Sequence, residues 1–176
     1  RRARLHLDIW YVFKNQGDRT KYTDVMNDYE WFFRPSLGAH FNAMVMEIGT
    51  LLDSRRKCVS IYKVVREMRK RSKFTKEAEM KLREKLKIVK PLLDKVLKIR
   101  HNVIAHMSAE TDPYSAFEKA SISANMFRNL INTIGEILEL VGKSAGLEFP
   151  GFLELGGDDA RDVLEKLRIS GGKNLE

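Results

Sequence analysis

The sequence TKEAEMKLREKLKIVKPLLDKVLKIRHNVIAH, residues 75–106, decides the fold that we expect for this chain. Its apolar side chains recur every three or four residues, which places them along one face of an α-helix. These apolar residues are Met80, Leu82, Leu86, Val89, Leu93, Val96, Leu97, Val103 and Ile104. Pro91 lacks a backbone N–H and clashes with the preceding turn, so it should kink this long helix or divide it in two.

The same helical spacing recurs through the rest of the chain. It extends over residues 1–15, 18–33, 35–53, 57–71 and 115–146, with turn residues between them. Few runs alternate apolar and polar residues, so strands find little support. The last long helix should pack antiparallel to the helix of residues 75–106, because the connection between them is short. The sequence therefore predicts an all-α protein, a helical bundle of about five to six helices.

Residues 35–53 have the most regular apolar spacing in the first half of the chain, which predicts a central core helix. Its small residues, which let another helix approach closely, are Gly38, Ala39, Ala43 and Gly49. The aromatic cluster before it consists of Tyr29, Trp31, Phe32 and Phe33. Such side chains can stack on RNA bases, but we favour a role in the core or in a dimer interface.

A glycine-rich stretch follows the last long helix. Its Gly156 and Gly157 lack the Lys and Ser/Thr that a phosphate-binding loop requires, so we interpret them as a linker. Asp158 then caps a short helix. We therefore expect the bundle to occupy residues 1–146, and residues 147–176 to hold a linker and a short C-terminal helix appended to it.

Basic residues concentrate in one part of the chain. Residues 55–100 carry 18 Lys and Arg against 5 Asp and Glu, a net charge of +13, whereas the whole chain carries +8. This distribution favours a polyanionic partner. Nucleic acid fits better than a membrane, because the basic helices lack a bulky aromatic face for insertion. The alternative is that these lysine-rich helix faces are simply solvated.

Composition and cysteine content are those of a soluble intracellular protein. Hydrophobic residues make up 43% of the chain and charged residues 32%. The single Cys58 excludes an internal disulfide and fits a reducing cytosol. No run of about 18 apolar residues is present to span a membrane. We therefore expect a cytoplasmic protein with no membrane partner.

Four residues with phosphate-binding or proton-transferring side chains end the helix of residues 75–106. They are Arg100, His101, Asn102 and His106. At about 100° per residue, Asn102 and His106 share a helix face, whereas Arg100 lies on another. Arg100 and His106 could still meet if the helix frays, if the arginine reaches round the axis, or across a symmetric dimer. Such a pair suits proton transfer at a phosphodiester.

Two other observations bear on this interpretation. The helix dipole favours arginine and histidine near a helix C-terminus even without catalysis, which is the alternative explanation. The chain has no HExxH, no paired cysteines and no dinucleotide-binding fingerprint, and carboxylates do not cluster around His106. We therefore expect neither a metal ion nor another cofactor.

This motif resembles that of the HEPN superfamily. An arginine, a polar residue and a histidine about six positions after the arginine end a long helix in a small all-helical chain. The arrangement, set in a helical pattern over roughly residues 5–145, is most similar to the HEPN domains of abortive-infection and toxin systems. The resemblance implies an HEPN-like bundle that dimerises, so that the motifs of two protomers form one cleft. It also implies metal-independent RNA cleavage, in which the ribose 2′-hydroxyl attacks the adjacent phosphate.

The resemblance also assigns roles to single residues. Arg100 would bind the scissile phosphate, and His106 would be the acid or base. His101 would be the polar residue that follows the arginine, and Asn102 an orienting group. The family often has Asn or Asp directly after the arginine, whereas here that position is His101 and the asparagine comes one residue later.

The function we expect is that of an endoribonuclease of a toxin or phage-defence, abortive-infection type. It would act on RNA as a homodimer, with an antitoxin protein as a further partner. The basic side chains that would lead RNA to Arg100 are Lys81, Arg83, Lys85, Lys87, Lys90 and Lys98. The alternative is a non-catalytic HEPN-like module that binds RNA, a nucleotide or a partner protein.

Overall fold

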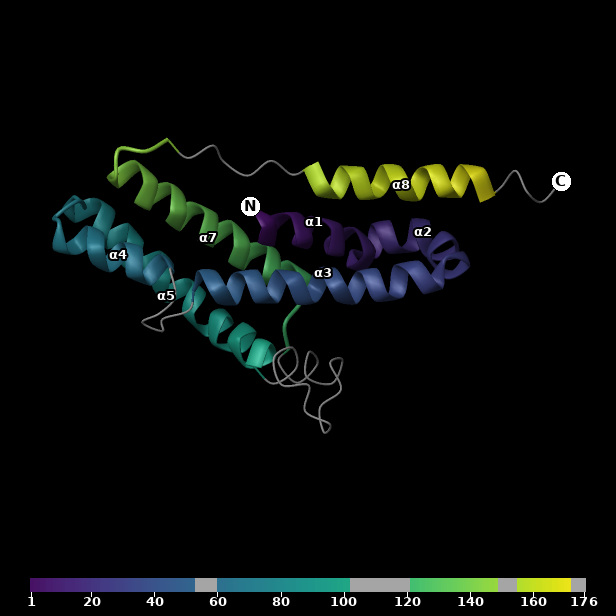
Figure 1. Cartoon of the computed structure of the whole chain (residues 1–176), viewed down its shortest axis with the longest axis horizontal. Coiled ribbons are helices and arrows are strands. Elements are labelled where there is room, and N and C mark those ends of the chain that lie inside the picture. The colour runs from purple at the N-terminus through teal and green to yellow at the C-terminus, as the bar shows by residue number, and fades with distance from the viewer. Residues whose placement is uncertain (53–59, 102–120, 149–154, 172–176) are drawn as a thin grey trace. The chain divides into compact units, whose positions relative to one another are not determined.

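The fold is all-helical in a computed structural model that describes residues 1–52, 60–101, 121–148 and 155–171 (Figure 1). Within these ranges every regular element is a helix. The helices are α1 (Arg2–Lys14), α2 (Gln16–Asp28), α3 (Glu30–Leu51), α4 (Ile61–Lys70), α5 (Lys76–Ile99), α7 (Ala124–Ser144) and α8 (Leu155–Gly171). The predicted all-α bundle with an added C-terminal helix is confirmed.

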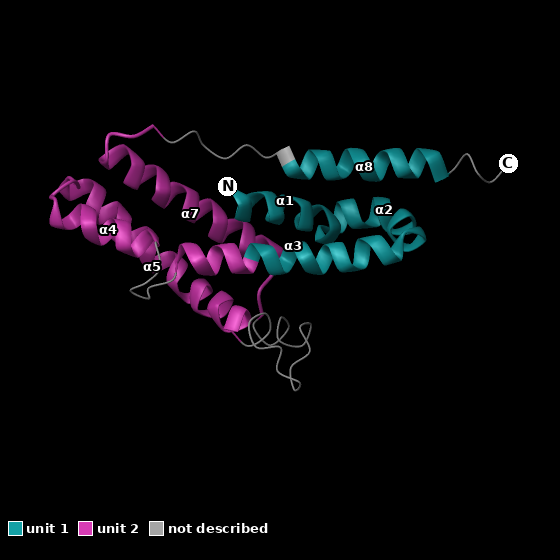
Figure 2. Cartoon of the chain, in the orientation of Figure 1, with its two compact units in different colours: residues 1–44, 153–176 teal, residues 45–152 magenta. Residues whose placement is uncertain are grey.

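The chain divides into two compact units (Figure 2). Unit 1 combines residues 1–44 with residues 153–176, and unit 2 is the continuous segment 45–152. The division falls inside α3, between Met44 and Val45.

Unit 1 has a core to which both ends of the chain contribute. The side chains in this core are Val12, Phe13, Tyr22, Val25, Phe33 and Leu164. They come from α1, α2, the first turns of α3, and α8. The rings of Phe13 and Phe33 meet edge to face, with their centroids 5.5 Å apart. Apolar burial therefore joins helices from opposite ends of the sequence.

Helix α8 packs on α1 and α2. It begins at Leu155, so Gly156 and Gly157 lie in its first turn, and their interpretation as a linker is wrong. A Cβ on Gly156 would lie 2.5 Å from Leu5 Cδ1 and 3.3 Å from the Leu5 carbonyl oxygen. Glycine is needed here because the backbones of α8 and α1 approach closely. Whether residues 1–146 fold without this helix stays a prediction.

Ion pairs add to the contact between α8 and α2. Arg161 binds Asp18 with two parallel bonds, Nε to Oδ1 and Nη2 to Oδ2, each 3.1 Å long. One turn further along α8, Glu165 accepts from Lys21 at 2.9 Å. Bidentate arginine–carboxylate pairs fix orientation as well as adding energy, so they set the register of α8 along α2.

Unit 2 is built around α5 and α7, which run antiparallel as expected (Figure 1). Their buried side chains are Leu82, Val89, Leu93, Val96 and Ile99 from α5, and Phe127, Leu130, Ile131, Ile134, Ile137 and Val141 from α7. Ser123 caps α7 by accepting from the Met126 N–H at 3.2 Å. Thr75 caps α5 in the same way through Ala78, at 3.1 Å. Side-chain caps therefore fix where both helices begin.

Two helix boundaries differ from the prediction. The break expected between residues 33 and 35 lies at Tyr29, whose carbonyl accepts from the N–H groups of Phe32 and Phe33. Pro35 stands inside α3, and Pro91 inside α5, which is not divided. A proline removes only one backbone hydrogen bond, and buried neighbours such as Phe33 and Val89 hold each helix together across it.

Candidate functional site

The described part of the predicted site is the end of α5. The regular α-helical turns end at Ile99, and Arg100 and His101 follow in a π-helical turn. The Arg100 N–H still donates to the carbonyls of Val96 and Leu97. Single π-turns inside helices occur frequently at functional sites.

Arg100 is half-buried and lies against α3. It follows Val96 by four residues and Leu93 by seven, so it continues the buried line of α5. Its side chain crosses α3 at Gly49, where a Cβ would lie 2.5 Å from Cδ and 3.1 Å from Nε of the arginine. The guanidinium group is therefore held against the backbone of a second helix.

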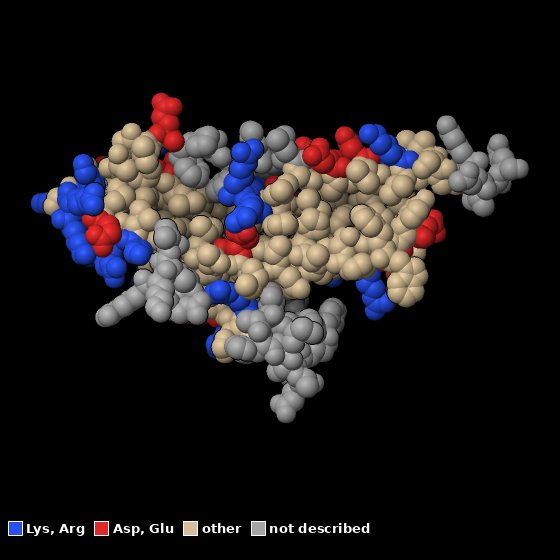
Figure 3. Space-filling model, viewed as in Figure 1, with Lys and Arg blue, Asp and Glu red and all other residues tan. Residues whose placement is uncertain are grey.

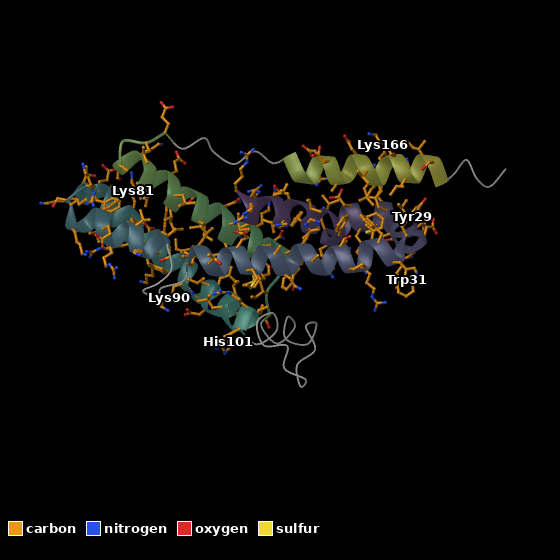
Figure 4. All side chains as sticks on the ribbon, viewed as in Figure 1. Tyr29, Trp31, Lys81, Lys90, His101 and Lys166 are labelled. Atoms are coloured by element: carbon orange, nitrogen blue, oxygen red, sulfur yellow. The ribbon has the colours of Figure 1, made fainter. Side chains whose placement is uncertain are left out.

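His101 faces the other way. Its side chain is exposed, three residues after Lys98 and seven after Asp94, both of which are also exposed. Figure 4 shows it at the outer end of the α5 ribbon. The two described motif residues therefore differ in burial, since Arg100 is packed against a helix and His101 is exposed.

The other two motif residues, Asn102 and His106, lie outside the described residues. The meeting of Arg100 with His106, in one chain or across a dimer, therefore stays a prediction.

Most of the cations predicted to bind RNA are engaged in ion pairs. Lys81 binds Glu77 at 2.6 Å, and Arg83 binds Glu79 at 2.9 Å. The remaining pairs are Lys85 with Glu136 at 2.5 Å and Lys90 with Asp94 at 2.9 Å. Carboxylates at this distance cancel much of the field that a phosphate would feel, so these four cations attract RNA less than their number suggests.

The other two predicted cations, Lys87 and Lys98, make no ion pair with any described residue. Both are exposed, and Lys95, which lies between them on the same face, makes none within the described ranges either. Figure 3 shows a further gathering of Lys and Arg over the turn between α4 and α5. The cations with uncompensated charge on α5 therefore form a line that ends beside the motif.

The partner carboxylates stay charged in neutral solution. A hydrogen bond from Lys81 lowers the pKa of Glu77, and hydrogen bonds from Arg69 and Arg83 lower that of Glu79 despite some desolvation. Both groups are therefore ionised throughout the neutral range, and the pairs persist there.

The family model for the HEPN protein AbiU2 matches residues 2–163, which is nearly the whole chain. The chain belongs to the AbiU2 family. It is therefore an HEPN module of the abortive-infection group. Searches of curated proteins and of solved structures gave no significant match.

Two features are absent from the described residues of this AbiU2-family chain. There, no three His, Cys, Asp or Glu side chains gather in a way that could hold a metal ion. No helix of the same residues is long and apolar enough to cross a membrane.

The sequence analysis missed two features that the structure brings together. His6 of α1 and His40 of α3 meet through their Nδ1 atoms at 3.0 Å, and burial together with the charge of His6 lowers the pKa of His40. Gly49 was noted only as a small residue that would let a helix approach. Each contact joins residues far apart in sequence, and neither leaves a local signal.

Proposed function

We propose that this AbiU2-family protein is a metal-independent endoribonuclease of the abortive-infection type. The observation that supports the proposal is Arg100, an arginine held half-buried against Gly49, beyond lysines of α5 that make no ion pair with any described residue. A guanidinium with its position fixed by packing is suited to bind a phosphate in a defined orientation. The family membership supports the same function.

The reaction needs two proton transfers and one centre of positive charge. The 2′-hydroxyl loses a proton as its oxygen bonds to phosphorus, and the 5′-oxygen gains a proton as its bond to phosphorus breaks. Arg100 neutralises charge on the phosphate oxygens. In a homodimer two copies of His106 are available, one to accept the first proton and one to donate the second. The products are a 2′,3′-cyclic phosphate and a 5′-hydroxyl.

RNA binding is assigned to the uncompensated cations of α5. Lys87 and Lys98 attract the backbone, while the paired lysines and arginine nearby contribute less. Exposed His101 lies where this line ends, and it contacts the nucleotide next to the scissile phosphate. An antitoxin protein that covers this end of α5 would block the substrate.

The test is the cleavage of single-stranded RNA by purified protein in EDTA. The expected products end in 2′,3′-cyclic phosphate, and both Arg100→Ala and His106→Ala should abolish them while the helical circular dichroism is unchanged. Arg34→Ala removes an exposed guanidinium from unit 1 and should cleave as the natural chain does. Intact RNA that still binds the protein would instead support the non-catalytic RNA-binding module.

A further inference from the structure

The two glycines of α3 differ in what surrounds them. A Cβ built on Gly38 meets nothing within 4 Å. A Cβ built on Gly49 would lie 2.5 Å from Cδ, 3.1 Å from Nε and 3.4 Å from Nη1 of Arg100. Gly49 is buried, and its nearest contacts are all atoms of that one side chain. The missing Cβ thus creates the space that Arg100 occupies.

Glycine is otherwise a poor choice inside a helix, even in the last turn of α3 where Gly49 lies, because it loses the most backbone freedom on folding. The backbone of α3 at Gly49 is ordinary helix, so no unusual dihedral angle requires glycine here. Its presence is therefore explained by the arginine and not by the helix. The contact also removes much of the freedom of a long side chain that elsewhere samples many rotamers.

We propose that Gly49 is a positioning residue for the reaction, and that it fixes the guanidinium of Arg100 where the scissile phosphate binds. This inference rests on the proposed ribonuclease function. Any side chain at position 49 pushes the arginine off α3. The arginine is flexible and can swing away, so the helices stay packed while the guanidinium leaves its position.

The test compares Gly49→Ala with Gly38→Ala, the same substitution on the same helix in open space. A displacement of about 1 Å in a catalytic group costs about a hundredfold in rate, so kcat of Gly49→Ala should fall by about that factor. The KM for RNA should stay within about twofold, because Lys87 and Lys98 are untouched. Gly38→Ala should keep both constants of the natural chain.

A double-mutant cycle separates positioning from general damage. In the Arg100→Ala background the clash is absent, so Gly49→Ala should raise Tm as Gly38→Ala does. In the natural background Gly49→Ala should lack that gain in Tm. If Gly49→Ala raised Tm equally in both backgrounds, the alanine would not clash with Arg100, and the proposed positioning role of Gly49 would be wrong.

The outcomes also distinguish this inference from the proposed function. If Arg100→Ala is inactive but Gly49→Ala cleaves at the natural rate, the positioning role is wrong and the ribonuclease function stands. If Arg100→Ala cleaves normally, or the natural chain cuts no RNA, the proposed function fails and the positioning role fails with it. The Tm cycle still reports the Gly49–Arg100 contact in that case.

Discussion

Adjacent residues in this protein often have opposite surroundings, because neighbours on a helix point about 100° apart. Arg100 packs on α3, whereas the side chain of His101 is exposed. In the first turn of α3, Phe33 is 5% exposed and Trp31 is 94% exposed. The sequence showed one aromatic cluster there and could not divide it, since the division depends on which residue meets Phe13 from another helix.

These exposures predict unequal effects of two aromatic-to-alanine substitutions. Phe33→Ala removes a ring from the core of unit 1 and should lower the free energy of unfolding by about 3–5 kcal/mol. Trp31→Ala removes a ring from solvent and should change it by less than about 0.5 kcal/mol. Urea denaturation of both variants measures the difference, and losses of similar size would contradict the assigned core.

Single residues of the site were predictable only in part. The choice of Arg100 as a candidate site residue and the resemblance to HEPN proteins both rest on residues that lie close together in the sequence. The contact of Arg100 with Gly49 joins two helices. The spacing of apolar residues in the sequence does not show which side chain of one helix packs against which residue of another. Such tertiary contacts can be predicted only once the packing of the helices is known.

On the scale of a helix, α5 carries two kinds of cation. Those paired with Glu77, Glu79, Asp94 and Glu136 are compensated, whereas Lys87, Lys95 and Lys98 make no ion pair with any described residue. The net charge calculated from the sequence does not distinguish these two kinds of cation. Pairing within a helix can be anticipated from i, i+4 spacing, but the pair of Lys85 with Glu136 depends on how α7 packs.

This difference predicts which lysines control RNA binding. Each cation that contacts single-stranded RNA adds about 0.7 to the slope of log affinity against log salt. The double variant Lys87→Ala/Lys98→Ala should therefore lower that slope by about 1.4. Lys81→Ala/Arg83→Ala removes the same charge from paired positions and should lower it by clearly less. Titrations of each variant with RNA at several salt concentrations measure these slopes. Equal slopes for the two double variants would contradict the assignment of RNA binding to Lys87 and Lys98.

At the scale of the whole molecule, periodicity predicted that the described elements are helices and roughly where most of them lie, because each buries one apolar face. It did not predict that α8 completes the core that contains α1 and α2. An amphipathic sequence pattern shows that a helix has an apolar face to bury, but it does not show which other helix covers that face. The glycines of α8 were misread for the same reason, since their use appears only when α1 lies beside them.

The contact between α8 and α2 should respond to acid. Hydrogen bonds from Arg168 and Lys21 lower the pKa of Glu165 to about 2, well below its usual value of 4.5. A lowered carboxyl pKa stabilises the fold above pH 4.5, and this stabilisation is lost as the pH falls towards 2. The natural chain should therefore be more stable than Glu165→Gln at pH 6, and the two should converge near pH 2.

Chemical denaturation at each pH measures this difference. Asp159→Asn removes an exposed carboxylate of the same helix that has no ion pair among the described residues, and it serves as the charge-matched control. A gap between the natural chain and Glu165→Gln that does not narrow in acid would show that the ion pairs of Glu165 add nothing to the fold.

The packing of Gly156 on Leu5 has a consequence for biosynthesis. Helix α8 is synthesised long after α1, so the face of α1 that α8 covers must wait for residues 155–171. Unit 2 is continuous and can fold during that wait. We therefore expect a nascent chain halted before α8 to leave this face of α1 uncovered, and to bind chaperones and be cut by proteases more readily than a chain that includes α8.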